Sequence, residues 1–137
     1  MNLKKDTEYA LRIISCLYNH GCIDSLDNCR KGMALFDLCI KTGIPRISLQ
    51  RICDKLKDNE LLVHTYAVDN HSIRYQVAEN IKSVSLLTLI EAVDNTCHMF
   101  LTFDQKTTYY KKNQHVFNLI DERYRLFLKM IQLKELL

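Results

Sequence analysis

Hydrophobic positions repeat with helical spacing through residues 33–62, and the repeat is interrupted once. Gly43 follows a short apolar run, and glycine readily adopts the left-handed conformation that ends a helix. Pro45 cannot prolong that helix but suits the first turn of another one. The second helix then has a predicted buried stripe at i, i+3, i+4 and i+7, formed by Leu49, Ile52, Cys53 and Leu56. The pattern predicts two helices joined by a tight turn, the outline of a helix-turn-helix.

After Leu62 the helical repeat gives way to an alternation of apolar and polar residues, which is typical of strands. The alternation predicts one strand over residues 64–67 and another over 73–77, with a polar tip at 68–72. A hairpin directly after the second helix of the motif is a wing. The tip contains no glycine, so we expect it to approach a nucleic-acid backbone less closely than a glycine-rich wing does.

Further helices are predicted on both sides of this motif. Residues 7–19 and 85–93 have apolar residues at helical spacing, and Ser83 or Ser85 is the expected cap of the second of these helices. A last long helix over about residues 114–131 is apolar around too much of its circumference for one buried face. We expect it to form a two-fold dimer, with packing inside one chain as the alternative. The expected dimer residues are Val116, Leu119, Ile120, Tyr124, Phe127, Leu128 and Ile131.

The predicted fold class is therefore mostly α with a small β-hairpin: a winged helix-turn-helix followed by a long C-terminal dimerisation helix. The 137 residues are expected to form one domain, since one proline and three glycines leave no flexible linker. Its predicted parts are a DNA-binding winged helix over 1–82, a connector or sensor over 83–113 and a dimerisation helix over 114–137. The chain lacks a membrane-length apolar run and a signal-peptide pattern, so we expect a cytoplasmic protein.

Positive charge is concentrated between the end of the first helix of the motif and the end of the second. Five basic residues and one acidic residue lie between Lys41 and Lys57, whereas the whole chain has a formal net charge of +3. Double-stranded DNA is the partner that this charge favours. The alternatives are a solvated basic surface, or a winged helix that binds another protein.

The outer face of this helix offers groups that read base edges. Arg46 or Arg51 can donate two hydrogen bonds to guanine, and Gln50 can pair in the same way with adenine. Lys55 and Lys57 lie further along the helix and suit phosphates. In the predicted wing, the residues with reach to phosphates or the minor groove are His71, Arg74 and Tyr75. A two-fold dimer with one such helix per chain predicts a palindromic operator.

Four segments of the chain resemble the Rrf2-type winged-helix transcription regulators in sequence and in order. They are LKKDTEYALRIISCL, GIPRISLQRICDKLKDNELL, SVSLLTLIEAVDN and YRLFLKMIQLKELL. The resemblance implies a DNA-binding homodimer that represses or activates transcription. It assigns base and phosphate contacts to Arg46, Ile47, Gln50 and Arg51. It also places the opening segment near the DNA backbone through Lys4, Lys5, Thr7 and Tyr9.

The chain departs from this family's pattern in the cysteines that follow E-A-V. Many members hold an iron–sulfur cluster there through three cysteines, but residues 95–114 contain only Cys97. We therefore expect no cluster and no metal. A site with nonstandard ligands would have to use Glu8, Cys97, His98 or His115. The resemblance then implies a bound metabolite or a partner protein as the signal.

The remaining cysteines also give no metal site. Cys16, Cys22 and Cys29 surround His20, but they lack the close C-x2-C pairing of structural zinc. We expect Cys16 to be buried, which leaves His20, Cys22 and Cys29 exposed, with a Cys22–Cys29 redox switch as an alternative. Cys39 and Cys53 occupy predicted interior positions.

Enzymatic activity is not predicted. The chain has no glycine-rich phosphate loop and no nucleophile-elbow motif, and its five histidines are scattered over different elements.

Overall fold

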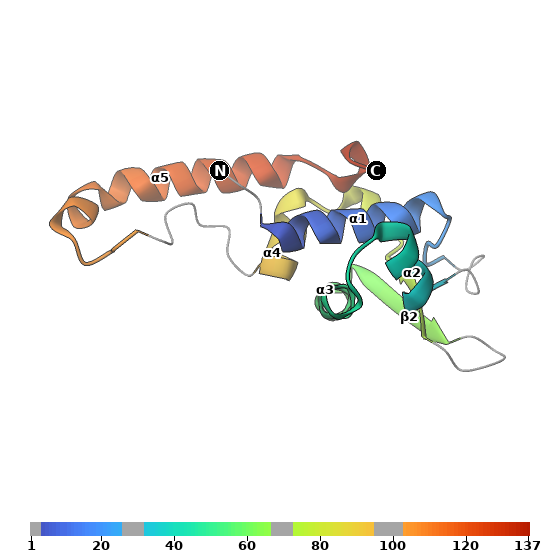
Figure 1. Cartoon of the computed structure of the whole chain (residues 1–137). Helices are drawn as coiled ribbons and strands as arrows, with labels where there is room; N and C mark the ends of the chain where they lie inside the picture. The colour runs from blue at the N-terminus through green and yellow to red at the C-terminus, as the bar shows by residue number, and fades with distance from the viewer. Residues whose placement is uncertain (1–3, 26–31, 67–72, 95–102) are drawn as a thin grey trace.

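The computed structural model describes residues 4–25, 32–66, 73–94 and 103–137. In these residues five α-helices accompany a small three-stranded antiparallel sheet, which confirms the predicted fold class, and the sheet lies at one edge of the molecule, packed on α1, α2 and α3 (Figure 1). The elements are α1 (Lys5–Asn19), β1 (Met33–Ala34), α2 (Leu35–Thr42), α3 (Arg46–Asp58), β2 (Leu62–Tyr66), β3 (Ile73–Val77), η1 (Ile81–Ser83), α4 (Leu86–Asp94), α5 (Thr108–Met130) and η2 (Leu133–Glu135).

Helix α1 lies at the centre of the core. Its buried stripe repeats at helical spacing and consists of Tyr9, Ala10, Ile13, Ile14 and Leu17. This stripe packs against α2, α3, α4 and β3. The predicted stripe of α3 is confirmed, because Leu49, Ile52, Cys53 and Leu56 are all fully buried. Burial of these two stripes against each other fixes which face of α3 points outward.

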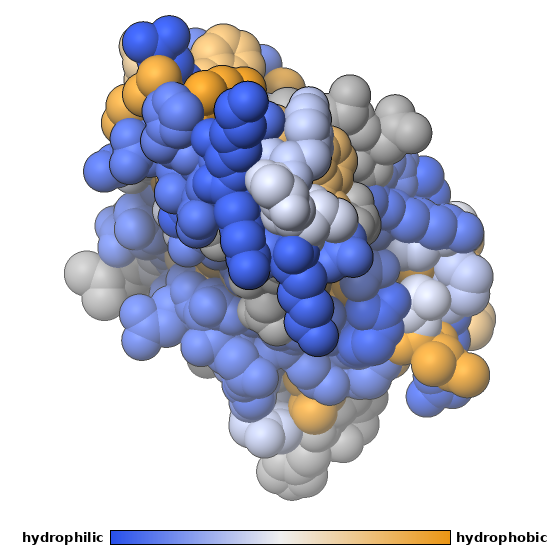
Figure 2. Space-filling view, turned by 90° about the vertical axis from the view of Figure 1, so that its left-hand side faces the viewer, coloured by the Kyte–Doolittle hydropathy of each residue, from blue (hydrophilic) through white to orange (hydrophobic). Residues whose placement is uncertain are grey.

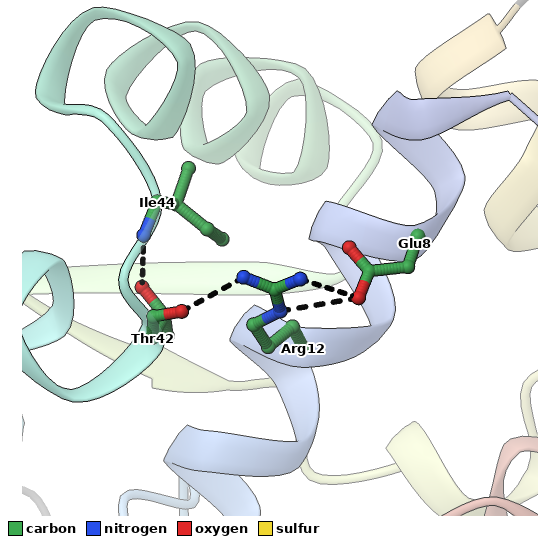
Figure 3. A network of polar contacts seen from close by, with 4 residues as sticks. All are labelled: Glu8, Arg12, Thr42 and Ile44. Atoms are coloured by element: carbon green, nitrogen blue, oxygen red, sulfur yellow. Dashed lines mark hydrogen bonds and ion pairs between the residues drawn. The ribbon is translucent and has the colours of Figure 1, made fainter.

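The turn between α2 and α3 is held by α1. Gly43 ends α2 with a φ of 71°, as predicted, and Pro45 is the N-cap of α3. Figure 3 shows Arg12 of α1 between the turn and Glu8. Its Nη1 donates to the Thr42 carbonyl (2.9 Å), while Nε and Nη2 donate to Glu8 Oε1 (3.2 and 2.6 Å). The Thr42 Oγ1 also accepts a hydrogen bond from the Ile44 N–H at 3.4 Å. The orientation of α3 is thus coupled to α1.

The sheet has one strand more than the predicted hairpin. Its order is β1-β3-β2, and Met33 of β1 and His64 of β2 both pair with Tyr75 of β3. Strand β2 begins at Leu62, two residues before the predicted start, and β3 has its predicted bounds. Met33 and Ala34 were predicted at the start of a helix, and this prediction is wrong. Two residues are too few to show the alternation by which a strand is recognised.

Helix α5 packs against α4, and its N-terminal part extends beyond the other helices and the sheet (Figure 1). It begins at Thr108, six residues before the predicted start, because the Thr107 Oγ1 caps it by accepting from the Tyr110 N–H. Its other end is anchored to the start of α4: the Leu86 N–H donates to the Ile131 carbonyl at 2.8 Å. Ser85, and not Ser83, caps α4 by accepting from the Thr88 N–H. Across the described ranges, no helix is both long and apolar enough to cross a membrane.

Candidate nucleic-acid interface

The outer face of α3 brings together the four residues that were predicted to contact bases. With Asp54 they line one shallow surface hollow, formed by Arg46, Ile47, Gln50, Arg51 and Asp54. Arg46 and Ile47 lie in the first turn of α3, and the Ile47 side chain is 86% exposed. Among the described residues Arg46 has no polar partner. The first turn of α3 is therefore open to a ligand without any rearrangement of the chain.

Arg51 is held by an acidic residue of α1. Its Nη1 and Nη2 donate to the two carboxylate oxygens of Asp6 at 2.6 and 3.0 Å. The hydrogen bonds from Arg51 lower the pKa of the Asp6 carboxyl below its usual value of 3.8. These bonds use two of the five N–H donors of Arg51, so a guanine contact through the same end of the guanidinium would replace two charge-assisted hydrogen bonds, whereas Nε–H and the other N–H groups have no bond to Asp6. Asp6 lies among the basic residues of the opening segment and was not predicted to belong to this site.

Gln50 also has partners inside the chain. Its Nε2 donates to Asp54 Oδ1 at 2.9 Å and to the Tyr75 hydroxyl at 3.3 Å. Tyr75 is buried, and this burial raises the pKa of its phenol. Tyr75 was predicted to touch DNA from the wing, but its side chain faces the interior and orients Gln50 instead. An adenine contact from Gln50 would replace one of the two hydrogen bonds that its amide nitrogen donates.

Lys55 does not extend into solvent as predicted for a phosphate contact. Its Nζ donates to the Val93 carbonyl at 3.0 Å, near the C-terminal end of α4. A lysine there satisfies one of the carbonyls that a helix leaves without a partner in its last turn. Lys57 lies on the exposed side of α3 and has no polar partner in the described part of the chain. Of these two lysines, only Lys57 could contact a phosphate without competition from a hydrogen bond inside the described part of the chain.

Two of the four residues assigned to the opening segment are buried. Thr7 donates a hydrogen bond from Oγ1 to Asp94 Oδ2, at the end of α4. Tyr9 belongs to the core, and Lys5 and Arg12 lie over its ring, each 5.3 Å from the centroid. Lys4 and Lys5 are exposed. The assignment of DNA contacts to Thr7 and Tyr9 is therefore corrected, because a core side chain cannot reach a backbone outside the chain.

The wing has fewer side chains available for DNA contacts than predicted. The Arg74 Nη1 donates to the Gly32 carbonyl at 3.2 Å, and this half-buried side chain ties β3 to the residue before β1. A Cβ added to Gly32 would lie 2.7 Å from the Arg74 Cβ, so the two residues are in close contact. His71 lies outside the described residues.

Helix α5 exposes much of the surface that was predicted to form a dimer. The predicted residues Val116, Leu119, Ile120 and Phe127 are exposed, and Tyr124 and Ile131 are half-buried against the core. Leu128 is only 4% exposed and belongs to the chain's own core, so its assignment to a dimer surface is corrected. Leu126 and Met130 are exposed and were missed. In Figure 2, hydrophobic atoms reach the surface at the top, at the height at which Figure 1 draws α5.

The cysteines do not form a ligand set in the described ranges. Contrary to prediction, Cys22 is buried and Cys16 is only half-buried. Cys39 is half-buried, and burial raises the pKa of the fully buried Cys53 to about 12. No three histidine, cysteine, aspartate or glutamate side chains of residues 4–25, 32–66, 73–94 and 103–137 lie together as a metal site would require. Cys29, Cys97 and His98 lie outside these ranges.

Comparisons with known proteins support the fold. No protein-family model and no curated protein sequence matches the chain. Solved structures match over nearly its whole length. CymR of Staphylococcus aureus in its oxidized form has a TM-score of 0.66 at 13% identity, covering 99% of this chain and 95% of that chain. CymR (YrzC), the global cysteine regulator of B. subtilis, has a TM-score of 0.68 at 12% identity with the same coverage.

A third structure, IscR of T. potens, has a TM-score of 0.64 at 12% identity and is matched over 99% of this chain and 86% of that chain. At these identities the likeness establishes the fold alone. The resemblance predicted from the sequence is confirmed at this level: the chain has the winged-helix fold of these regulators.

Proposed function

We propose that this chain is an Rrf2-type transcription regulator that binds double-stranded DNA sequence-specifically, as a homodimer on a palindromic operator. The observation that carries the proposal is the first turn of α3, which presents Arg46 and Ile47 to solvent on a helix held by α1 and α2. In helix-turn-helix proteins this turn of the second helix contacts base edges in the major groove. The proposed role is binding in the cytoplasm, without catalysis.

Charge around α3 supports contacts to the DNA backbone. Lys41, Lys57, Lys4 and Lys5 are exposed, and Lys41 and Lys57 lie in the last turns of α2 and α3. A lysine that donates no hydrogen bond inside the chain can neutralise a phosphate at little cost, because it has no internal hydrogen bond to break. These lysines would fix the position and orientation of the protein on the duplex, while Arg46 and Ile47 would distinguish one base sequence from another.

Exposed apolar surface on α5 supports the homodimer. A helix that leaves Leu119, Leu126, Phe127 and Met130 in solvent gains free energy when a second copy covers them. A two-fold axis through this helix would pair two α3 helices and match an inverted repeat in DNA.

We further propose that the regulator works without an iron–sulfur cluster. The donor groups of the described residues do not fit one: the Glu8 carboxylate is occupied by Arg12, and Cys22 and Cys53 are buried separately in the core. His115 is exposed on α5, with no second donor beside it in the described ranges. A bound metabolite or a partner protein would then supply the signal.

The competing function is a winged helix that binds another protein, and salt dependence separates the two. We expect affinity for a pool of random duplexes to fall with salt at a logarithmic slope of about −5, the value for six phosphate contacts per dimer. Fluorescence anisotropy at 50 to 200 mM salt measures this slope. Undetectable binding, or a slope near zero, would refute DNA binding.

Lys55 and Lys57 provide a matched pair of variants. Lys55→Met removes the hydrogen bond to the Val93 carbonyl, so we expect it to lower the free energy of unfolding by about 1 kcal/mol and to leave the salt slope unchanged. Lys57→Met should leave stability within about 0.5 kcal/mol and make the slope shallower by about 2 per dimer. Urea denaturation and the salt titration measure both quantities. The reverse pattern would show that Lys55, and not Lys57, contacts phosphate.

Asp6→Asn tests whether the ion pair restrains Arg51. The substitution removes a negative charge beside the proposed DNA surface and frees the guanidinium, so affinity for random duplexes should rise by about threefold to tenfold. The cost in stability should be small, about 0.5 kcal/mol, because the pair is partly exposed. Weaker binding would show that Asp6 positions Arg51 for DNA, and unchanged binding would show that the ion pair does not restrain Arg51.

The same ion pair predicts a pH dependence. Because the pKa of Asp6 is lowered by folding, its contribution to stability is complete above 3.8, the value of the free carboxyl, and is lost as the pH falls below it. When the free energy of unfolding is measured between pH 6 and pH 2, it should therefore decrease less for Asp6→Asn than for the wild-type chain.

A further inference from the structure

Ile47 is the most exposed large hydrophobic side chain of the described residues, at 86%. It lies in the first turn of α3, and the other residues that line its hollow are Arg46, Gln50, Arg51 and Asp54, all polar or charged. A single exposed isoleucine is ordinary on a protein surface. Here, however, it occupies the part of the proposed recognition helix that would lie deepest in the major groove.

The major groove of DNA offers an apolar partner of one kind. Each base pair displays hydrogen-bond donors and acceptors there, and only thymine adds a C5-methyl group. We propose that Ile47 packs against a thymine methyl in each half of the operator and so requires thymine at that position. This inference rests on the proposed function and adds the base that the site recognises.

The hydrogen bonds of the neighbouring side chains also favour Ile47 as a residue that contacts bases. Arg51 is held by Asp6, and Gln50 is held by Asp54 and Tyr75. Turning either side chain away from these partners and toward a base breaks internal hydrogen bonds. Ile47 has none to break.

Ile47 also loses little freedom on binding. A β-branched side chain in a helix has one strongly preferred χ1 rotamer, so its γ carbons are positioned before DNA arrives. Arg46, beside it, is free to donate to a phosphate or to guanine. Together they would give the first turn one apolar and one charged contact to adjacent groups of the DNA.

The test removes the methyl groups one position at a time. The operator is defined as the sequence that the protein enriches from a library of random duplexes, and each thymine of a half-site is replaced in turn by uracil, which lacks only the C5 methyl. At one position of the half-site, we expect the thymine-to-uracil change to lower affinity about fourfold when it is made in one half-site and about fifteenfold when it is made in both. These factors correspond to the loss of one buried methyl group per half-site. Thymines elsewhere serve as internal controls.

Two variants connect this effect to Ile47. Ile47→Ala should bind the thymine and uracil operators equally, whereas Ile47→Val should retain part of the difference. Both should fold, because the side chain is exposed, and circular dichroism checks this. If no position responds to uracil, or if Ile47→Ala keeps the full response, the thymine contact is refuted while selective DNA binding stands. If no duplex is enriched, the proposed function fails, and this inference fails with it.

Discussion

Replacing Arg46 with alanine is expected to weaken binding to the operator by about a hundredfold, and binding to random duplexes by less than about tenfold. An arginine that donates two hydrogen bonds to guanine contributes about 1–3 kcal/mol of discrimination, and a dimer loses two such contacts. The side chain is exposed and has no polar partner in the described chain, so the fold should be unaffected. Anisotropy titrations against the operator and a shuffled duplex of equal length measure the two losses.

Two control variants separate charge from geometry at this position. Arg46→Lys keeps the positive charge but lacks the planar fork, so it should retain binding to random duplexes and still lose operator affinity. Lys134→Ala removes an exposed charge from η2 and should change neither affinity. Equal losses on the operator and the shuffled duplex would assign Arg46 to phosphate contact and leave base reading to other residues.

Phe127→Asp is expected to convert the dimer to monomers and to reduce operator affinity by more than about a hundredfold. Phe127 is 60% exposed on α5, and an aspartate there would bury a charge without a partner in the proposed interface. Each chain would then bind a half-site on its own, and it would lose the gain in affinity that comes from two linked chains binding two half-sites together. Sedimentation should give a mass of 16.1 kDa for the variant and twice that for the wild-type chain.

The matched control for this experiment lies outside α5. Leu136 is 48% exposed after η2, and Leu136→Asp should leave both the mass and the operator affinity unchanged. Thermal unfolding of all three proteins shows whether the substitutions alter the fold itself. A wild-type chain that sediments as a monomer at about 100 μM, or a Phe127→Asp variant that stays dimeric, would contradict the assignment of α5 as the dimer helix.

Much of the fold could be predicted because local sequence determines it. The apolar period of α3, the glycine that ends α2 and the strand alternation in β3 each express a constraint within a few residues. The first six residues of α5 were missed because residues 108–113 are mostly polar and the helix there depends on a cap from Thr107. The two residues of β1 form a strand only because β3 lies beside them.

The errors in the candidate site have a different cause. The sequence identifies which residues face outward on α3, but it does not identify their partners. Arg51 and Asp6 are 45 residues apart, Lys55 and Val93 are 38 apart, and Thr7 and Asp94 are 87 apart. Side chains with the right chemistry for DNA were therefore counted as free, although the packing of α1, α3 and α4 against one another gives them hydrogen bonds.

Selection from a library of random duplexes, with the stoichiometry of the selected complex measured by sedimentation, tests the central claim most directly. A homodimer that reads bases through α3 should enrich an inverted repeat whose half-sites lie about one helical turn apart, bound by two chains. An absence of enrichment, or an unrepeated site bound by one chain, would contradict a dimeric sequence-specific regulator.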